Sequence, residues 1–249
     1  MRTKLETYDH MMNMTAKLGY PLEKILFQSS QWHDAKSILD VGSGNGDYIS
    51  MVARDLPEKE FLSIENDKFL ADLALQKHSV KNLKLVNSSY EQLEENSTFD
   101  FVMGRRLVTY IKNRKRFYSW LWNHLSLNGG ILIIDTDMED FLLNSELPTF
   151  SNLFTSLKEN SIKEKSLSIK TIIEKEFIWA GFSHVSTKSV IINTSIPQVK
   201  EIIYTYLYLS AEYVLGSPLP SDISEELFSW LISPSAYIQF NMFGAFFTK

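Results

Sequence analysis

The feature that most constrains the fold of this chain is a short apolar run that leads directly into three closely spaced glycines. Residues 37–41 read Ser-Ile-Leu-Asp-Val, and residues 42–46 read Gly-Ser-Gly-Asn-Gly. The apolar run is typical of a buried strand, whereas apolar side chains recur at helical spacing from Tyr48 to Ala53. Glycine lets the backbone approach a ligand closely, and a helix start offers free N–H groups. The sequence therefore predicts a strand, a tight loop and a helix, with a binding site at the loop.

This strand-and-helix unit recurs along the chain. Strands are predicted at 60–65, 83–86, 99–103 and 131–135, and a turn at 128–130 precedes the last of these. The helices predicted between them cover 68–78, 90–93 and 115–125. Towards the end, a helix is expected at 168–180 and strands at 185–192 and 239–248. Such alternation implies an α/β fold with a doubly wound, mostly parallel sheet that has helices on both faces.

Composition argues against several classes of protein. The chain has no cysteine and five scattered histidines, so we expect no metal site. A net charge of −5 opposes a broad surface that tracks phosphates, and nucleic acid is not an expected partner. There is neither a signal-peptide pattern nor an apolar run of the roughly 18 residues that a membrane span needs. These features predict a cytoplasmic protein without a membrane partner.

Two carboxylates flank the glycine loop. Asp40 lies two residues before Gly42, and Glu65 ends the second predicted strand. The spacing departs from the Gly-x-Gly-x-x-Gly loop of dinucleotide-binding proteins, because Asp47 stands where the third glycine would be. The carboxylate of Asp40 suits a cationic ligand group and repels a pyrophosphate. Glu65 can accept hydrogen bonds from both ribose hydroxyls of a nucleoside, and capping of the next helix is its alternative role.

Taken together, these residues resemble the class I S-adenosylmethionine-dependent methyltransferases. Residues 38–46 resemble the first motif of that family, and Glu65 resembles its ribose-binding acid. Residues 99–103 resemble its fourth strand, 125–134 the segment leading into its fifth strand, and 242–247 its antiparallel last strand. The resemblance implies a Rossmann-like fold, S-adenosylmethionine as the cofactor, S-adenosylhomocysteine as the product and a small molecule as the substrate.

The resemblance also implies a set of site residues. Ser89 stands where many relatives have an Asp that holds the adenine amino group, and a Ser can still accept one hydrogen bond. Tyr110 stands where many small-molecule relatives have a His, so it is the candidate base or orienting residue. Arg106 is a candidate substrate contact because a guanidinium binds a carboxylate through two hydrogen bonds, and packing is the alternative. Tyr8 and Tyr208 are further candidate substrate contacts. The expected cofactor contacts are Asp40, Gly42, Ser43, Gly44, Gly46, Glu65, Asn66, Ser89, Tyr90 and Arg105.

Two regions lie outside the repeating pattern. Residues 1–34 read as helical with a break at 19–21, and the resemblance implies that they form a lid over the cofactor. The remainder, 35–249, is expected to be the methyltransferase domain. Its aromatic-rich helical block is too long for a plain connection, so we expect a cap inserted at about 196–238. This block is equally suited to a homodimer interface.

Several functions remain open from the sequence. The leading interpretation is methyl transfer from S-adenosylmethionine to an N, O or C atom of a small molecule, such as a carboxylate-bearing or aromatic metabolite. A protein or nucleic-acid methyltransferase is the second, and a basic face beside the site would favour it. A non-enzymatic binding module with the same fold is the third, and the replacement of Asp by Ser89 favours it. The loop spacing disfavours an NAD-dependent oxidoreductase.

Overall fold

The computed structural model describes residues 2–93, 97–136, 146–159, 168–216 and 218–249. The chain divides into two compact units, each built from separate stretches of sequence. Unit 1 comprises residues 1–19, 136–168 and 190–242, and unit 2 comprises 20–135, 169–189 and 243–249. Among the helices that the structure describes, none combines the length and apolar character needed to cross a bilayer.

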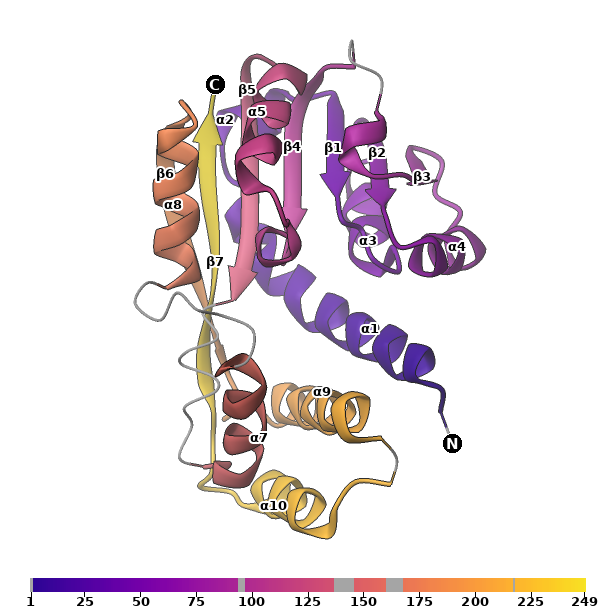
Figure 1. Cartoon of the computed structure of the whole chain (residues 1–249), viewed down its shortest axis with the longest axis vertical. Helices are drawn as coiled ribbons and strands as arrows, with labels where there is room; N and C mark the ends of the chain where they lie inside the picture. The colour runs from indigo at the N-terminus through magenta and orange to yellow at the C-terminus, as the bar shows by residue number, and fades with distance from the viewer. Residues whose placement is uncertain (1, 94–96, 137–145, 160–167, 217) are drawn as a thin grey trace. The chain divides into compact units, whose positions relative to one another are not determined.

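A seven-stranded sheet has the order β3-β2-β1-β4-β5-β7-β6. Strands β3, β2, β1, β4 and β5 pair in parallel, and Figure 1 shows the arrow of β7 running opposite to those of β1, β4 and β5. The sequence-based prediction of a mostly parallel α/β sheet with one antiparallel strand is therefore confirmed. The strands are β1 (Ser37–Val41), β2 (Glu60–Glu65), β3 (Leu83–Asn87), β4 (Phe99–Arg105), β5 (Leu125–Thr136), β6 (Ser183–Asn193) and β7 (Gln239–Thr248).

Helices connect the strands at the expected places in the chain. Helix α4 packs against β2 and β3, α3 packs against β2, and α2 packs against β4. Short 3₁₀ helices lie at η1 (Lys24–Phe27), η2 (Tyr90–Gln92) and η3 (Val108–Tyr110). The α-helices are α1 (Lys4–Glu23), α2 (Ser30–Asp34), α3 (Asp47–Asp55), α4 (Lys68–Lys77), α5 (Arg114–His124), α7 (Pro148–Glu159), α8 (Ile169–Trp179), α9 (Pro197–Leu215) and α10 (Ser221–Ile232).

Two local predictions were wrong. The break expected at 19–21 is absent, because α1 continues through Pro21 to Glu23. A proline inside a helix removes one backbone hydrogen bond, and the buried contacts of neighbouring Tyr20 and Glu23 help to offset that loss. Strand β5 begins at Leu125 rather than 131, and Asn128 sits within it at a φ of 66°. The expected turn is thus an irregularity inside a strand, with a register shift in its pairing to β4.

The polar contacts of unit 1 fasten its helices. Lys200 of α9 is buried, and its ammonium group donates to the carbonyls of Ser233 and Ala236, each at 2.6 Å. Glu226 of α10 accepts the backbone N–H groups of Thr149 and Phe150 at the first turn of α7, each at 2.8 Å. A carboxylate at a helix N-terminus satisfies otherwise unpaired N–H groups and suits the helix dipole. These contacts therefore hold α7, α9 and α10 in one unit.

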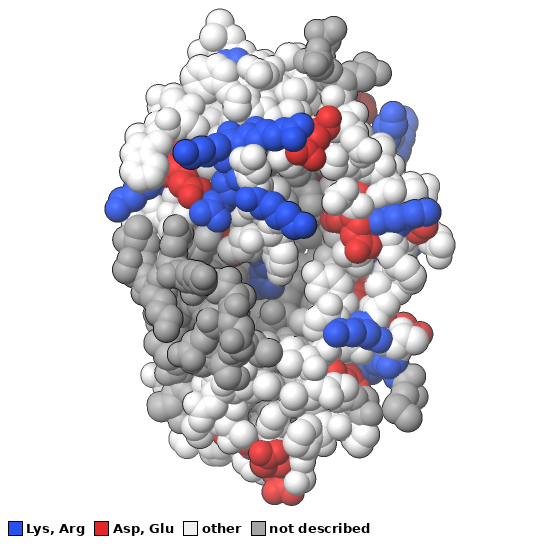
Figure 2. Space-filling view, viewed as in Figure 1, with Lys and Arg blue, Asp and Glu red and all other residues white. Residues whose placement is uncertain are grey.

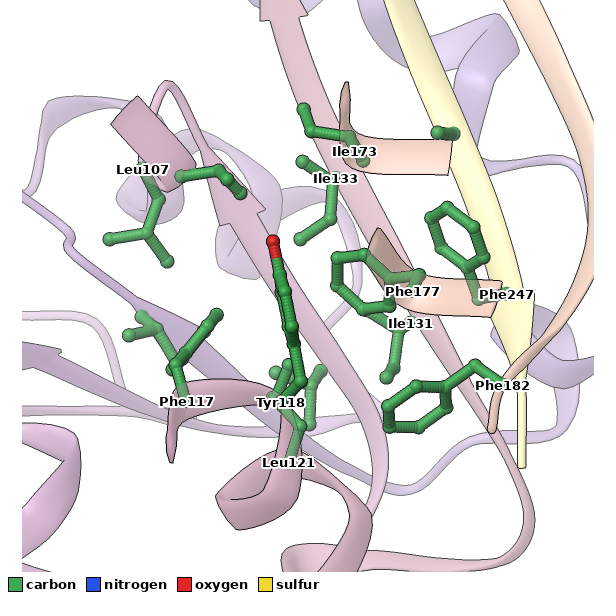
Figure 3. Close-up of a cluster of buried hydrophobic side chains, with 14 of the residues drawn as sticks. Leu107, Phe117, Tyr118, Leu121, Ile131, Ile133, Ile173, Phe177, Phe182 and Phe247 are labelled. Carbon is green, nitrogen blue, oxygen red and sulfur yellow. The ribbon is translucent and has the colours of Figure 1, made fainter. Parts of the chain in front are cut away.

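A buried apolar cluster in unit 2 packs α5 and α8 against the sheet. Figure 3 shows the ring of Phe177, on α8, among side chains from α5, β5 and β7. Phe177 is fully buried and stacks on Phe247 at 4.3 Å between ring centroids, and the ring of Tyr118 lies at 4.6 Å. The Tyr118 hydroxyl donates to Glu176, so the one polar atom of that ring is satisfied.

The position of Phe177 makes it a sensitive probe of this cluster. We expect Phe177→Ala to lower the free energy of unfolding by about 3–5 kcal/mol, because it leaves a cavity among large rings. Trp179→Ala is the matched control on the same helix, since Trp179 is 80% exposed; its effect should stay within about 0.5 kcal/mol. Urea unfolding followed by circular dichroism measures both, and equal losses would contradict the assigned packing.

Candidate functional site

The glycine loop joins β1 to α3 in a conformation that requires glycine. Gly42, Gly44 and Gly46 have φ angles of 78°, 57° and 75°, all in the left-handed region. A Cβ on Gly42 would lie 2.9 Å from Leu107, and one on Gly46 would lie 3.0 Å from Ala74. Backbone conformation and close packing therefore exclude side chains at these two positions, and the loop lies directly against its neighbours.

Glu65 connects the end of β2 to this loop. Its carboxylate accepts the backbone N–H of Gly44 through Oε2 and that of Asp67 through Oε1, both at 2.8 Å. Asp67 provides the cap of α4, since its side chain accepts the N–H groups of Phe69 and Leu70. Glu65 is half-buried and leaves further lone pairs for a ligand, because each carboxylate oxygen can accept two hydrogen bonds.

Asp40 is a buried carboxyl group in the middle of the site. It pairs across the sheet with Ser63, whose hydroxyl donates to Oδ2 at 2.7 Å. Burial raises the pKa of the Asp40 carboxyl to about 7. The Ser63 hydrogen bond and the positive charge of Arg105 lower this pKa, whereas the negative charge of Glu65 raises it. Asp40 can therefore gain or lose a proton near neutral pH, according to the charge that lies beside it.

Arg105, at the end of β4, forms a buried ion pair with Glu23. Its Nε and Nη2 donate to the two carboxylate oxygens at 2.9 Å each, and the carboxylate is fully buried. The guanidinium lies 4.5 Å from the ring centroid of Tyr48. Burial, together with the charge of Glu23, raises the pKa of the Tyr48 hydroxyl well above its usual value. The cofactor contact expected of Arg105 stays a prediction, and in this structure its charge is balanced by Glu23.

A second charged cluster surrounds Asp47, the residue that follows the glycine loop. Asp47, the first residue of α3, is buried, and its Oδ2 accepts from the Asn45 amide at 2.6 Å and from Lys77 at 3.1 Å. His78 Nε2 lies 2.9 Å from Asp47 Oδ1. Sequence reasoning used Asp47 only to exclude a dinucleotide loop. The His78 contact could not be read from spacing, because the two residues lie 31 positions apart.

The remaining cofactor candidates follow β2 and β3. Ser89 forms a capping box with Gln92, whose side-chain oxygen accepts the Ser89 N–H at 2.9 Å. Tyr90 is half-buried, and its ring packs edge-on against Phe117 at 5.0 Å. Asn66 is exposed, and its carbonyl lies 3.4 Å from the Asn87 amide nitrogen. Their cofactor roles stay predictions.

Of the substrate and catalytic candidates, Arg106 and Tyr110 belong to unit 2, whereas Tyr8 and Tyr208 belong to unit 1. Arg106 has a φ of 53°, and its N–H donates to the carbonyl of Ile134 at 2.7 Å. Tyr110 lies in η3 with 74% of its surface exposed. In unit 1, Tyr8 packs against Tyr213 and Tyr208 against Tyr204. Over the described residues, no group of three or more His, Asp or Glu side chains is arranged to hold a metal ion.

Comparison with known proteins identifies the family of the chain. The family model of a methyltransferase domain matches residues 32–202, which is more than half of the chain. The chain therefore belongs to this methyltransferase family, and the class I resemblance drawn from the sequence is confirmed.

Individual relatives are distant. A malonyl-[acyl-carrier protein] O-methyltransferase of Bacillus anthracis is 23% identical, over 69% of this chain and 60% of its own length. This chain thus spans less than two thirds of that relative. A tRNA (guanine-N(7)-)-methyltransferase of Nitrosomonas europaea is 29% identical, over 52% of this chain and 65% of its own length. Among solved structures, phosphoethanolamine N-methyltransferase 2 of Haemonchus contortus, a complex with S-adenosylhomocysteine, matches with a TM-score of 0.56 and 16% identity. That match covers 98% of this chain and 57% of the other, and it shows a shared fold.

The raised pKa of Asp40 has a consequence for stability. Its folded pKa of about 7 exceeds the ordinary value of 3.8 for an aspartate, so the folded chain holds an extra proton between these values. The associated stability is fully present at low pH and is lost as the pH rises towards about 7. Asp40→Asn removes this titration. We expect the variant to gain free energy of unfolding relative to the parent as the pH rises from about 5 to about 8, by up to about 2.7 kcal/mol.

Urea unfolding at a series of pH values measures this difference. Asp34→Asn is the control, because Asp34 is exposed; its curve should run parallel to that of the parent chain. A constant difference between the Asp40→Asn variant and the parent across this range would contradict a raised pKa at Asp40.

Proposed function

We propose that this protein transfers a methyl group from S-adenosylmethionine to an N, O or C atom of a small molecule. The observation that carries the proposal is the contact between Glu65 and the glycine loop. The carboxylate is fixed by the N–H of Gly44 in a loop whose three glycines all have positive φ angles. Such an acid beside such a loop suits the ribose and the backbone-contacting part of a nucleoside cofactor.

The residues around the loop fit a cofactor that carries a positive charge. The carboxyl groups of Asp40 and Glu65 influence each other electrostatically, and a cation beside them would favour the ionised form of Asp40. A pyrophosphate would meet repulsion at the same place. When bound, S-adenosylmethionine supplies an electrophilic methyl group on its sulfonium. Ser89 and Tyr90 are proposed to contact the adenine, and Gly42, Ser43, Gly46, Asn66 and Arg105 to complete the site.

The chain's own contribution to the reaction is proposed to be positioning and exclusion of water. Holding the two reactants in line converts an encounter between molecules into a reaction within one complex. Tyr110 is proposed to orient the acceptor or to remove its proton, and Arg106 to bind an acceptor carboxylate. Tyr8, in the proposed lid, and Tyr208, in the proposed cap at about 196–238, are further acceptor contacts. The proposed product is S-adenosylhomocysteine, and no metal takes part in the proposal.

A nucleic-acid methyltransferase is the second candidate, because one relative acts on tRNA by its name. A tRNA substrate calls for a basic surface that follows phosphates. On the face drawn in Figure 2, Lys and Arg side chains lie next to Asp and Glu side chains. The net charge of −5 also opposes such a surface. Both observations favour the small-molecule proposal.

Calorimetric titration with S-adenosylmethionine and S-adenosylhomocysteine tests the proposed cofactor. We expect binding of both, and Glu65→Ala should weaken each by about 1–3 kcal/mol, because it removes the proposed partner of the ribose hydroxyls. Glu60→Ala is the matched control, since Glu60 is an exposed acid on the same strand.

The two possible failures have different meanings. Unchanged affinity in Glu65→Ala would remove Glu65 from the cofactor site and leave the cofactor in place. Absence of binding by the parent chain would overturn the proposed reaction and favour a binding module that only shares the fold.

A further inference from the structure

Unit 1 contains a buried carboxylate oxygen that lacks a hydrogen bond. Glu212 lies in the last part of α9, and its side chain is only 10% exposed. Its Oε2 is buried and has no hydrogen-bond partner. The nearest charged partner is Arg2, whose Nη1 lies 3.8 Å away, beyond hydrogen-bond distance. A buried oxygen of this kind costs free energy that a donor from a ligand would recover.

Tyrosine residues lie close to Glu212 in the sequence of α9. Tyr213 follows Glu212 directly, and its ring centroid is 5.4 Å from that of Tyr8 on α1. Tyr204 and Tyr208 precede Glu212 by eight and four residues, so helical spacing puts all three along one side of α9. The Tyr204 and Tyr208 rings are in contact, with centroids 6.2 Å apart. A carboxylate and tyrosine rings are each suitable partners for a cation.

The chain's own cations already occupy this region. The ammonium group of Lys4 lies 4.7 Å from the ring centroid of Tyr213, and Arg2 is the ion-pair partner of Glu212. Both residues are exposed and belong to the first few residues of the chain. Exposed contacts such as that of Lys4 are weak because solvent screens them and because long side chains lose freedom when they are held. The guanidinium of Arg2 is half-exposed, whereas the side chain of Glu212 is only 10% exposed, so a ligand must displace Arg2 to reach this carboxylate.

We infer that Glu212, together with Tyr213 and Tyr8, forms a binding site for an organic ammonium ion. The N–H of the ligand donates to Oε2 of Glu212, and its charge lies against the tyrosine rings. Arg2 and Lys4 compete with the ligand for these groups. All three residues belong to unit 1, so the inference stands apart from the proposed function.

The test uses ethylammonium chloride as the probe and the full chain without added cofactor. Ligand-observed NMR measures binding, with sodium chloride at equal ionic strength as the blank. We expect Glu212→Gln to weaken binding by about tenfold, because it removes the charge and keeps the shape. Glu201→Gln should bind as the parent chain does, since Glu201 is an exposed carboxylate on the same helix.

A double variant, Arg2→Ala with Lys4→Ala, separates this site from a purely structural ion pair. Removing the competing cations should strengthen ethylammonium binding by about threefold. Weaker binding in the double variant, or parental affinity in Glu212→Gln, would overturn the inference. Melting temperatures of all variants check that each remains folded.

Titration of the same samples with S-adenosylmethionine distinguishes the two proposals. Cofactor binding without ethylammonium binding overturns this inference alone. Ethylammonium binding that depends on Glu212, in a chain that does not bind the cofactor, overturns the proposed function alone and keeps the cation site.

Discussion

The pairing of β1 with both β2 and β4 is the constraint on which the candidate site depends. Because the three strands run in parallel, their carboxyl ends meet at one edge of the sheet. The register sets Asp40 beside Ser63 on one side and Met103 on the other. Glu65 and Arg105 end the two neighbouring strands. A change of register would move these side chains away from the glycine loop, so the chemistry of the site follows from strand pairing.

Charge balance at this edge depends on a residue far away in the chain. Burial of Arg105 requires a counter-charge, and Glu23 at the end of α1 provides it through two hydrogen bonds. The positive charge of this guanidinium lowers the pKa of Asp40, and the negative charge of Glu65 raises it. The protonation of Asp40 therefore depends on Arg105 and Glu65, and Glu23 balances the charge of Arg105. The continuation of α1 through Pro21 is what brings Glu23 to this set.

The sequence predicted the elements with local signals and missed the contacts between distant segments. The bounds of β1 and β2 were predicted correctly, because apolar runs and the glycines mark them. The start of β5 was wrong, since Asn-Gly-Gly is a turn signal that strand pairing overrides here. Glu23 and His78 were not singled out, because their partners lie 82 and 31 residues away. The roles of the site residues themselves stay predictions.

Charged side chains in unit 1 form hydrogen bonds with backbone groups. Lys200 donates two hydrogen bonds to carbonyls, and Glu226 accepts two from the first turn of α7. Each charge is matched by backbone groups that would otherwise lack partners, so each fastens one segment to another. Glu212 differs, because its buried Oε2 accepts no hydrogen bond and its ion-pair partner is the half-exposed guanidinium of Arg2, 3.8 Å away. The inferred cation site gives this largely buried carboxylate a partner beyond Arg2.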